Sequence, residues 1–300
     1  MRIKIIFMVL SLSFFSANAF CESYWQQFNA LLIKGDFEEQ LKLLKEWEKT
    51  DAADAELYVA YFNYYVNKSR KEIVRFGNDP KVGALAVTEA GNKEPVAYMY
   101  SEISYDPDLM KEGYKKINAG IEKYPERLDM RFGKIYMCGE TGDYETFTKE
   151  IIDTIEYSGK IQNKWMWTDG KILENPQEFM LSAIQDYQVK LYNTENDDLL
   201  ENMKLIAETI LKYYPEHVES LSNLSLVHSL RKEYDKALEL LHSAEKIAPQ
   251  DVVVLSNIAQ IYKITGDIEK SKKYYELAIK YGNENEKKYA REQIESLKNK

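Results

Sequence analysis

Histidine and cysteine are scarce in this chain of 300 residues, which contains three histidines and two cysteines. These side chains supply many of the ligands of transition metals and many catalytic bases and nucleophiles. The chain also lacks a phosphate-binding glycine motif, the metalloprotease pattern HExxH, the pattern CxxC and the esterase pattern GxSxG. We therefore expect no catalytic residue, no bound metal and no cofactor.

Positive charge and long apolar runs are lacking as well. The chain carries 40 basic and 49 acidic residues, which gives a formal net charge of −9. This balance argues against a nucleic-acid partner and against binding to an acidic membrane surface. No apolar run after residue 19 reaches the roughly 20 residues that a helix needs to cross a bilayer. We expect no transmembrane segment in the chain after that point.

The N-terminal segment has the features of an export signal. A basic start is followed by an apolar run over residues 5–15, which is too short to span a bilayer comfortably. Small residues then stand at Ala17 and Ala19, as in an A-x-A cleavage site. We predict a signal peptide over residues 1–19 and a protein exported to the periplasm or secreted, with a buried N-terminal helix as the alternative.

The two cysteines do not suggest a disulfide. Cys21 follows Phe20, whereas a lipid-anchoring signal needs a small residue at that place, so we disfavour a lipid anchor at Cys21. Cys138 lies in an apolar helical stretch and is expected to be a buried, unreactive thiol.

The C-terminal third of the chain repeats itself. Residues 218–251 and 252–285 are two 34-residue blocks that align without a gap, with Ala244 matching Ala278. In each block apolar residues recur at helical spacing, stop at a short polar break and then resume. Each block is therefore predicted to form two antiparallel helices.

These blocks resemble the tetratricopeptide repeat, a helix–turn–helix unit of 34 residues. That family has small residues where helices approach closely and a Gly-Asp turn between the two helices, as at Gly266-Asp267. The same turn occurs at Gly35-Asp36 and at Gly142-Asp143, and small residues stand at Gly113 and Gly120. The resemblance implies an all-α fold, a right-handed α-solenoid of five or six helix pairs. The combination with an export signal also resembles exported repeat proteins of Bacteroides-like bacteria that have no assigned activity.

Two stretches interrupt the repeat. Apolar residues alternate over residues 85–87 and 96–100, which predicts a β-hairpin inserted between the two helices of one repeat. A second break contains Trp165 and Trp167. The expected order is a signal peptide (1–19), N-terminal repeat-like helices (20–67), the hairpin insert (68–104), central repeats (105–161), a tryptophan-containing loop (162–176), C-terminal repeats (177–285) and a capping helix (286–300).

The resemblance implies a concave groove lined by the first helix of each pair, and hence a protein or peptide partner. This sequence lacks the groove lysines with which chaperone-binding relatives clamp a terminal carboxylate. We therefore expect a partner helix or extended segment with apolar and basic side chains. Alternatively, Phe132 and Tyr136 pack against the hairpin or the neighbouring repeat. The groove candidates are Asp129, Phe132, Tyr136, Glu140, Glu219, Ser222, Leu226 and Gln260.

Two other functions stay open at this point. Trp165 and Trp167 either pin their loop to the solenoid or stack on a sugar ring, which would make the protein a glycan- or cell-wall-binding module. An enzymatic site on the hairpin insert is the remaining alternative, with no recognisable spacing among its polar residues. The candidates for that site are Arg75, Asp79, Glu89 and Glu102. We favour a non-catalytic scaffold for protein–protein contact.

Overall fold

The computed structural model describes residues 23–80, 83–91 and 93–297. The predicted signal peptide and Cys21 lie outside these residues. Within them, no helix combines the length and the apolar character that crossing a bilayer requires.

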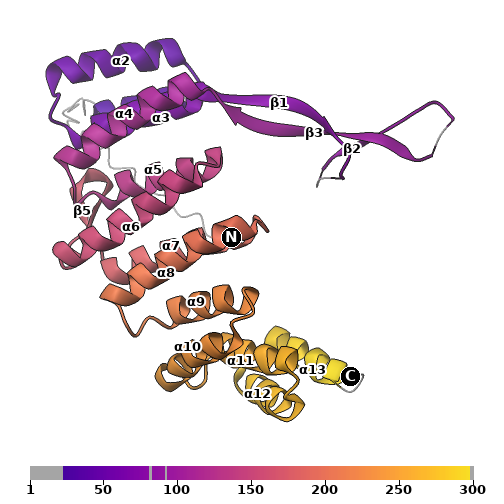
Figure 1. Ribbon diagram of the computed structural model, residues 1–300. Coiled ribbons are helices and arrows are strands. Elements are labelled where there is room, and N and C mark those ends of the chain that lie inside the picture. Colours follow the sequence, from indigo (N-terminus) through magenta and orange to yellow (C-terminus); the bar gives the residue numbers. More distant parts are fainter. Residues whose placement is uncertain (1–22, 81–82, 92, 298–300) are drawn as a thin grey trace, which may run out of the picture.

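The described part of the chain contains thirteen α-helices, and the first twelve form six antiparallel pairs stacked along one direction (Figure 1). The last helix caps the stack and begins two residues before the predicted Glu286. The helices are α1 (Tyr24–Lys34), α2 (Phe37–Thr50), α3 (Ala55–Ser69), α4 (Pro107–Lys123), α5 (Leu128–Thr141), α6 (Tyr144–Lys160), α7 (Pro176–Tyr192), α8 (Leu200–Tyr213), α9 (Val218–Leu230), α10 (Tyr234–Ile247), α11 (Val252–Thr265), α12 (Ile268–Tyr281) and α13 (Glu284–Leu297).

The Gly-Asp turns join the helices of three pairs as the sequence predicts. Each glycine ends a helix in the left-handed conformation, with φ of 68° at Gly35, 74° at Gly142 and 87° at Gly266. A residue with a side chain is strained there, whereas glycine is not. The aspartate that follows caps the next helix, and its carboxylate accepts an N–H bond of 3.1 Å in all three turns.

Small residues allow the helices of the second pair to approach closely. A Cβ atom added at Gly120 of α4 would lie 2.8 Å from the Tyr58 Cβ of α3, and one at Gly113 would lie 3.1 Å from the Tyr65 Cβ. Both values are shorter than ordinary van der Waals contact. The close packing of α3 against α4 therefore requires glycine at both positions, as the repeat pattern predicts.

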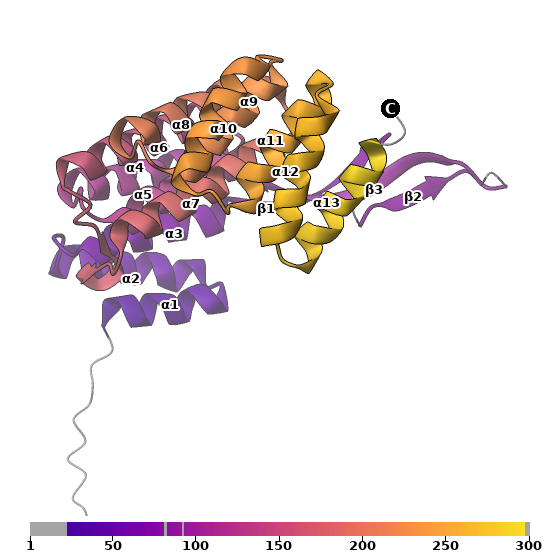
Figure 2. The same ribbon diagram turned by 90° about the horizontal axis from the view of Figure 1, so that it is seen from below.

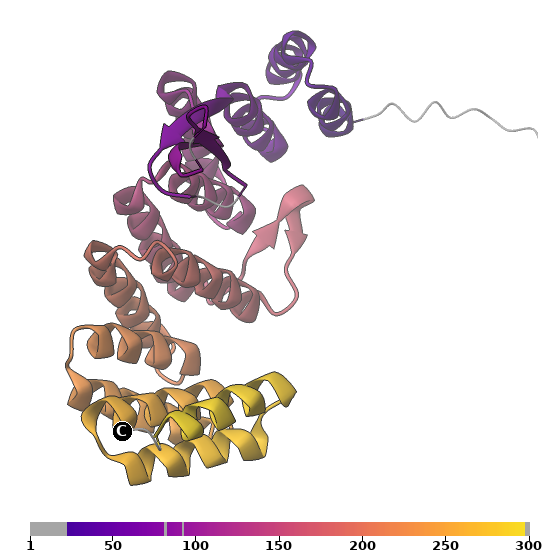
Figure 3. The ribbon, with the colours of Figure 1, turned by 90° about the vertical axis from the view of Figure 1, so that its right-hand side faces the viewer.

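The buried side chains form a series of clusters along the stack. The largest cluster joins α5 to α9 and contains the fully buried Phe147, Ile151 and Ile184. Cys138 belongs to it, is 1% exposed and forms no disulfide. The predicted buried thiol is confirmed. Viewed from the side, the pairs follow an arc (Figure 3).

The first insert is a three-stranded antiparallel sheet that projects beyond the helices as an arm (Figures 1 and 2). The prediction of a two-stranded hairpin was incomplete, because β1 pairs with the other side of β3. Three of the eight residues of β1 are basic and one is acidic, so its alternation of apolar and polar residues is weak. The insert lies between α3 and α4, the two helices of one pair, as predicted. Its strands are β1 (Arg70–Gly77), β2 (Leu85–Thr88) and β3 (Pro95–Tyr105), in the order β1-β3-β2.

The second insert separates α6 from α7 and contains a small hairpin. Its strands are β4 (Met166–Trp167) and β5 (Lys171–Ile172), joined by the short 3-10 helix η1 (Thr168–Gly170). The hairpin lies on the inner side of the arc in Figure 3. Beyond it, α6 packs against α8, and α7 contacts α8 and α9.

Glycine-to-alanine substitutions test the close approach of α3 and α4. We expect Gly120→Ala to lower the urea midpoint, because the clash with Tyr58 and Met130 outweighs the gain in helix propensity of about 1 kcal/mol. Gly133→Ala in α5 is the matched control, since its Cβ would meet only Phe62 at 3.6 Å. The control should keep the propensity gain and raise the midpoint. If both variants gain stability, close helix approach does not explain the glycine at position 120.

Candidate functional site

The predicted groove on α5 is covered at Phe132, which is only 6% exposed. Its ring lies 6.4 Å from that of Trp167 in β4, 6.3 Å from that of Phe179 and 5.8 Å from that of Tyr187. Phe179 and Tyr187 both belong to α7. The alternative interpretation of Phe132, packing against the neighbouring repeat, therefore describes its position, although the insert that covers it is the second one and not the hairpin insert. Phe132 offers a partner little surface.

Asp129 is also engaged inside the protein. Its two carboxylate oxygens accept hydrogen bonds of 2.8 and 2.7 Å from the guanidinium of Arg127, and its side chain is 8% exposed. Arg127 is 2% exposed and also contacts the Glu56 carboxylate of α3 at 2.8 Å. Burial disfavours the charged guanidinium, but hydrogen bonds to Asp129 and Glu56 outweigh this effect and raise the pKa of Arg127. Asp129 is a structural residue and contributes little to any groove surface.

Tyr136 and Glu140 lie at the C-terminal end of α5, where the surface is open. The Tyr136 side chain is 52% exposed. The Lys190 ammonium of α7 lies 5.4 Å from the Tyr136 ring centroid and 2.5 Å from the Glu140 carboxylate. Tyr136 is available to a partner, whereas the charge of Glu140 is neutralised by Lys190.

The two tryptophans of the second insert pin it to the solenoid. Trp165 is fully buried, with its ring centroid 5.7 Å from that of Tyr157 and 5.6 Å from the Arg131 guanidinium. Trp167 packs edge-on against Phe179 at 5.1 Å. The buried Trp165 ring cannot stack on a sugar, and the partly buried Trp167 ring is engaged by Phe132 and Phe179, so the structure gives no support to the glycan-binding alternative.

An open acidic surface lies on α7 and the start of α9, which we call the α7 groove. It comprises two adjoining cavities of about 700 and 470 Å³, which share Asn175, Glu178 and Ser182. The first also contains Gln185, His217 and Glu219, and the second contains Glu174, Phe179 and Asp186.

Four exposed carboxylates give this groove its charge. Within the described residues, Glu174, Glu178 and Asp186 form no ion pair, and the Glu219 carboxylate lies 3.3 Å from the Nε2 atom of His217. Burial lowers the pKa of His217, so its ring is uncharged at neutral pH and does not neutralise Glu219. The groove is therefore negative. Its second cavity combines Glu174, Glu178 and Asp186 with a Phe179 side chain that is 40% exposed.

The other predicted groove residues occupy different environments. Ser222 is 8% exposed, and its hydroxyl is buried without a hydrogen-bond partner in the described structure. Leu226 packs against the largest core cluster. The Gln260 side-chain oxygen accepts a hydrogen bond of 2.8 Å from the Tyr275 hydroxyl. Of the eight groove candidates, only Glu219 lines the α7 groove.

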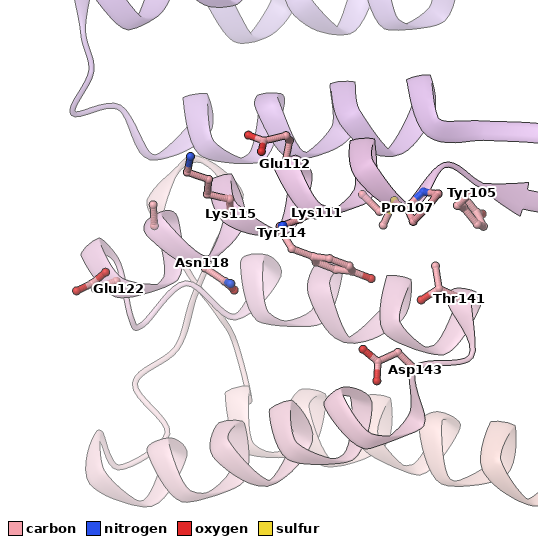
Figure 4. A pocket seen from close by; sticks show the side chains of 12 residues that line it. Tyr105, Pro107, Lys111, Glu112, Tyr114, Lys115, Asn118, Glu122, Thr141 and Asp143 are labelled. Atoms are coloured by element: carbon pink, nitrogen blue, oxygen red, sulfur yellow. The ribbon is translucent and has the colours of Figure 1, made fainter.

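Another cavity, of about 920 Å³, lies along α4, the second helix of the α3–α4 pair, and beside the turn between α5 and α6 (Figure 4). The Tyr114 side chain points from α4 toward Thr141 and Asp143 in this view. Burial raises the pKa of Tyr114. The rim carries both Lys115 and Glu122, so its charges do not select a partner of one sign.

The polar residues of the arm form no site that resembles a catalytic centre. The Arg75 guanidinium pairs with the Glu102 carboxylate at 2.9 Å, with both side chains about half exposed. Asp79 and Glu89 are exposed. Among the residues that the structure describes, no three histidine, cysteine, aspartate or glutamate side chains come together as metal ligands.

The sequence did not single out α7 as the element that carries the open surface. Its acidic residues Glu174, Glu178 and Asp186 follow no pattern that separates them from solvated helix charges. The sequence showed that the second insert interrupts the repeat, but it did not show which groove residues the insert would cover.

Comparison with known proteins agrees with the observed helix pairs. The family model of the tetratricopeptide repeat matches residues 253–285, which include most of α11 and all of α12. The chain thus contains a tetratricopeptide repeat in its last helix pair, and the other five pairs have the same two-helix arrangement. No curated protein matches the chain.

Several solved structures resemble the chain at low identity. YrrB, described as a tetratricopeptide-repeat protein with an unusual peptide-binding site, is 15% identical over 77% of this chain and 88% of its own, with a TM-score of 0.35. PilF of Pseudomonas aeruginosa is 12% identical over 90% of this chain and 96% of its own, with a TM-score of 0.38. Yeast Tom70 is 13% identical over 87% of this chain and 58% of its own, with a TM-score of 0.34. At such scores the likenesses carry no argument about function.

Removal of the buried guanidinium tests the role of Arg127. We expect Arg127→Met to lower the free energy of unfolding by about 3–5 kcal/mol, because Glu56 and Asp129 then remain buried without a cation. Arg75→Met breaks an exposed ion pair and should cost less than about 1 kcal/mol. Urea denaturation followed by circular dichroism compares the two variants. Equal losses of unfolding free energy in the two variants would show that the contact of Arg127 with Glu56 and Asp129 stabilises the protein no more than the exposed Arg75–Glu102 pair does.

Proposed function

We propose that this protein is an exported, non-catalytic scaffold that binds a segment of a partner protein in the α7 groove. The segment carries basic and apolar side chains, in an extended or helical conformation. The observation that supports this proposal is the group of four exposed carboxylates in this groove, three of which line the same cavity as Phe179, whose side chain is 40% exposed.

The chemistry of the groove selects such a segment in two ways. Lysine or arginine side chains gain from the uncompensated carboxylates of Glu174, Glu178 and Asp186, and this attraction is screened by salt. An apolar side chain gains from covering Phe179. Neither a nucleic acid nor an acidic peptide fits a surface of this charge.

The surrounding solenoid supports binding by holding the groove in shape. Phe179 packs against Phe132 and Trp167, and the side-chain amides of Gln185 and Asn223 pair between α7 and α9 at 2.6 Å. Because these contacts exist without a partner, little ordering entropy is lost when a segment binds.

Charge reversal in the groove tests the binding proposal. The purified protein is cross-linked in envelopes of its host, the captured peptides are identified, and their affinities are measured by fluorescence anisotropy. We expect basic and apolar peptides whose dissociation constant rises with salt. The double variant Glu178→Lys, Glu219→Lys should weaken binding by about tenfold or more, since it reverses two of the four charges.

The matched control is Glu276→Lys, a charge reversal on the exposed face of α12, where 58% of the side chain is accessible. It should leave the affinity unchanged. Binding that is insensitive to the groove variant, or retention on envelope polysaccharide with no peptide captured, would contradict the proposal.

Export is the other part of the proposal and rests on the pattern of residues 1–19. We expect the protein recovered from its host to begin at Phe20, because the A-x-A site ends at Ala19. Intact-mass measurement of protein from the envelope and periplasmic fractions determines this. A chain that retains residues 1–19 in the cytosolic fraction would rule export out.

A further inference from the structure

One face of the β1-β3-β2 arm is largely apolar and uncovered, and we call it the arm face. The strand register places Phe76 and Leu85 on either side of Met99, so these three side chains share a face. By the same register Val74 and Ile103 lie on this face nearer the solenoid, opposite Ser101 and Glu72 respectively. The Ser101 hydroxyl donates a hydrogen bond of 2.5 Å to the Glu72 carboxylate, so the apolar part of the face is the part farther from the solenoid. Its apolar members are Val74, Phe76, Leu85, Val87, Ala97, Met99 and Ile103.

These side chains are unusually exposed for a β-sheet. Val74 is 64% exposed, Phe76 65%, Leu85 63% and Ile103 44%. The opposite face is mixed: it carries Ile73, Tyr98 and Tyr100 beside two ion pairs, Arg75 with Glu102 and Lys71 with Asp106, both at 2.9 Å. A sheet ordinarily covers its more apolar face. Within the described residues no helix packs on it; the arm extends beyond the solenoid (Figure 2).

We propose that the arm face binds the arm face of a second copy of this chain, with the two sheets packed face to face about a two-fold axis near Phe76. A contact of this kind is isologous, so the same patch serves both copies and the assembly closes as a dimer. It is independent of the α7 groove, which lies on other elements.

The available area suits a weak contact that forms as the protein concentration rises. With accessible areas of roughly 150–200 Å² for each large residue, the exposed fractions of Val74, Phe76, Leu85 and Ile103 amount to about 350–470 Å² of apolar surface per copy. Two copies would bury about 700–950 Å², which corresponds to a weak, concentration-dependent interface. A patch of this size is comparable to the largest patch that a typical monomer exposes, and such patches are often functional.

The charge of the arm favours a second copy as the occupant. The strands carry three basic residues, Arg70, Lys71 and Arg75, and two acidic residues, Glu72 and Glu102. They are thus nearly neutral in a chain whose formal net charge is −9. Because the arm projects from the helices (Figure 1), two arms can meet while the acidic solenoids stay apart.

The test is the mass of the purified protein over a concentration series, measured by sedimentation equilibrium. We expect a monomer–dimer equilibrium. Phe76→Glu should raise its dissociation constant by about tenfold or more, because the new charge would be buried in the contact. Val74→Lys is the second variant and should act in the same direction. The matched control is Ile33→Glu, at a side chain on α1 that is 89% exposed, which should change nothing.

Cross-linking tests the placement of the axis and does not depend on affinity. Under mild oxidation Phe76→Cys should form a disulfide-linked dimer, whereas Ile33→Cys should not. Helical circular dichroism of each variant verifies that the solenoid is folded. A protein that stays monomeric at all concentrations, a dimer that Phe76→Glu and Val74→Lys leave intact, or an arm occupied only by a different protein overturns the proposal.

Discussion

The contact on which the middle of this solenoid depends is the buried guanidinium of Arg127. It holds Glu56 of α3 and Asp129 of α5, while Glu56 also accepts the backbone N–H of Asp169 in the second insert at 2.8 Å. A buried cation is costly unless carboxylates surround it with good geometry. The three elements that supply these groups must therefore assemble together. This requirement fixes the insert against two consecutive helix pairs.

Fixing the insert decides which part of the inner surface remains open. With Trp165 fully buried beside Tyr157, the short β4 strand carries Trp167 onto Phe132 and Phe179. The aromatic side chains that would have lined a groove on α5 become part of the packing. The open acidic surface is displaced to α7 and α9. The location of the proposed binding site thus depends on the ion pairs of Arg127 and on the packing of Trp167, in addition to the repeat.

The sequence predicted the features that local interactions determine. The Gly-Asp turns and the small residues at Gly113 and Gly120 make their contacts inside a single helix pair. A 34-residue sequence pattern therefore suffices to predict them. The burial of Asp129 and Phe132 depends on an insert whose residue Asp169 contacts Glu56, 113 positions earlier. No periodic pattern encodes a contact of that separation. Strand β1 was missed for a related reason. Its sequence is rich in charged residues and lacks a clear strand pattern, and it forms a strand because it pairs with β3.

The α7 groove and the arm face differ in charge, and this difference separates their proposed roles. The α7 groove repels a second acidic solenoid and attracts a basic segment, whereas the nearly neutral arm face has no such preference and gains only by excluding water. Two copies joined through their arms would present two grooves on one particle. A partner with two basic segments would then bind the second groove at a high effective concentration, provided its linker spans the distance between the grooves. Dimerisation through the arm would in this way increase avidity without any change in the groove itself.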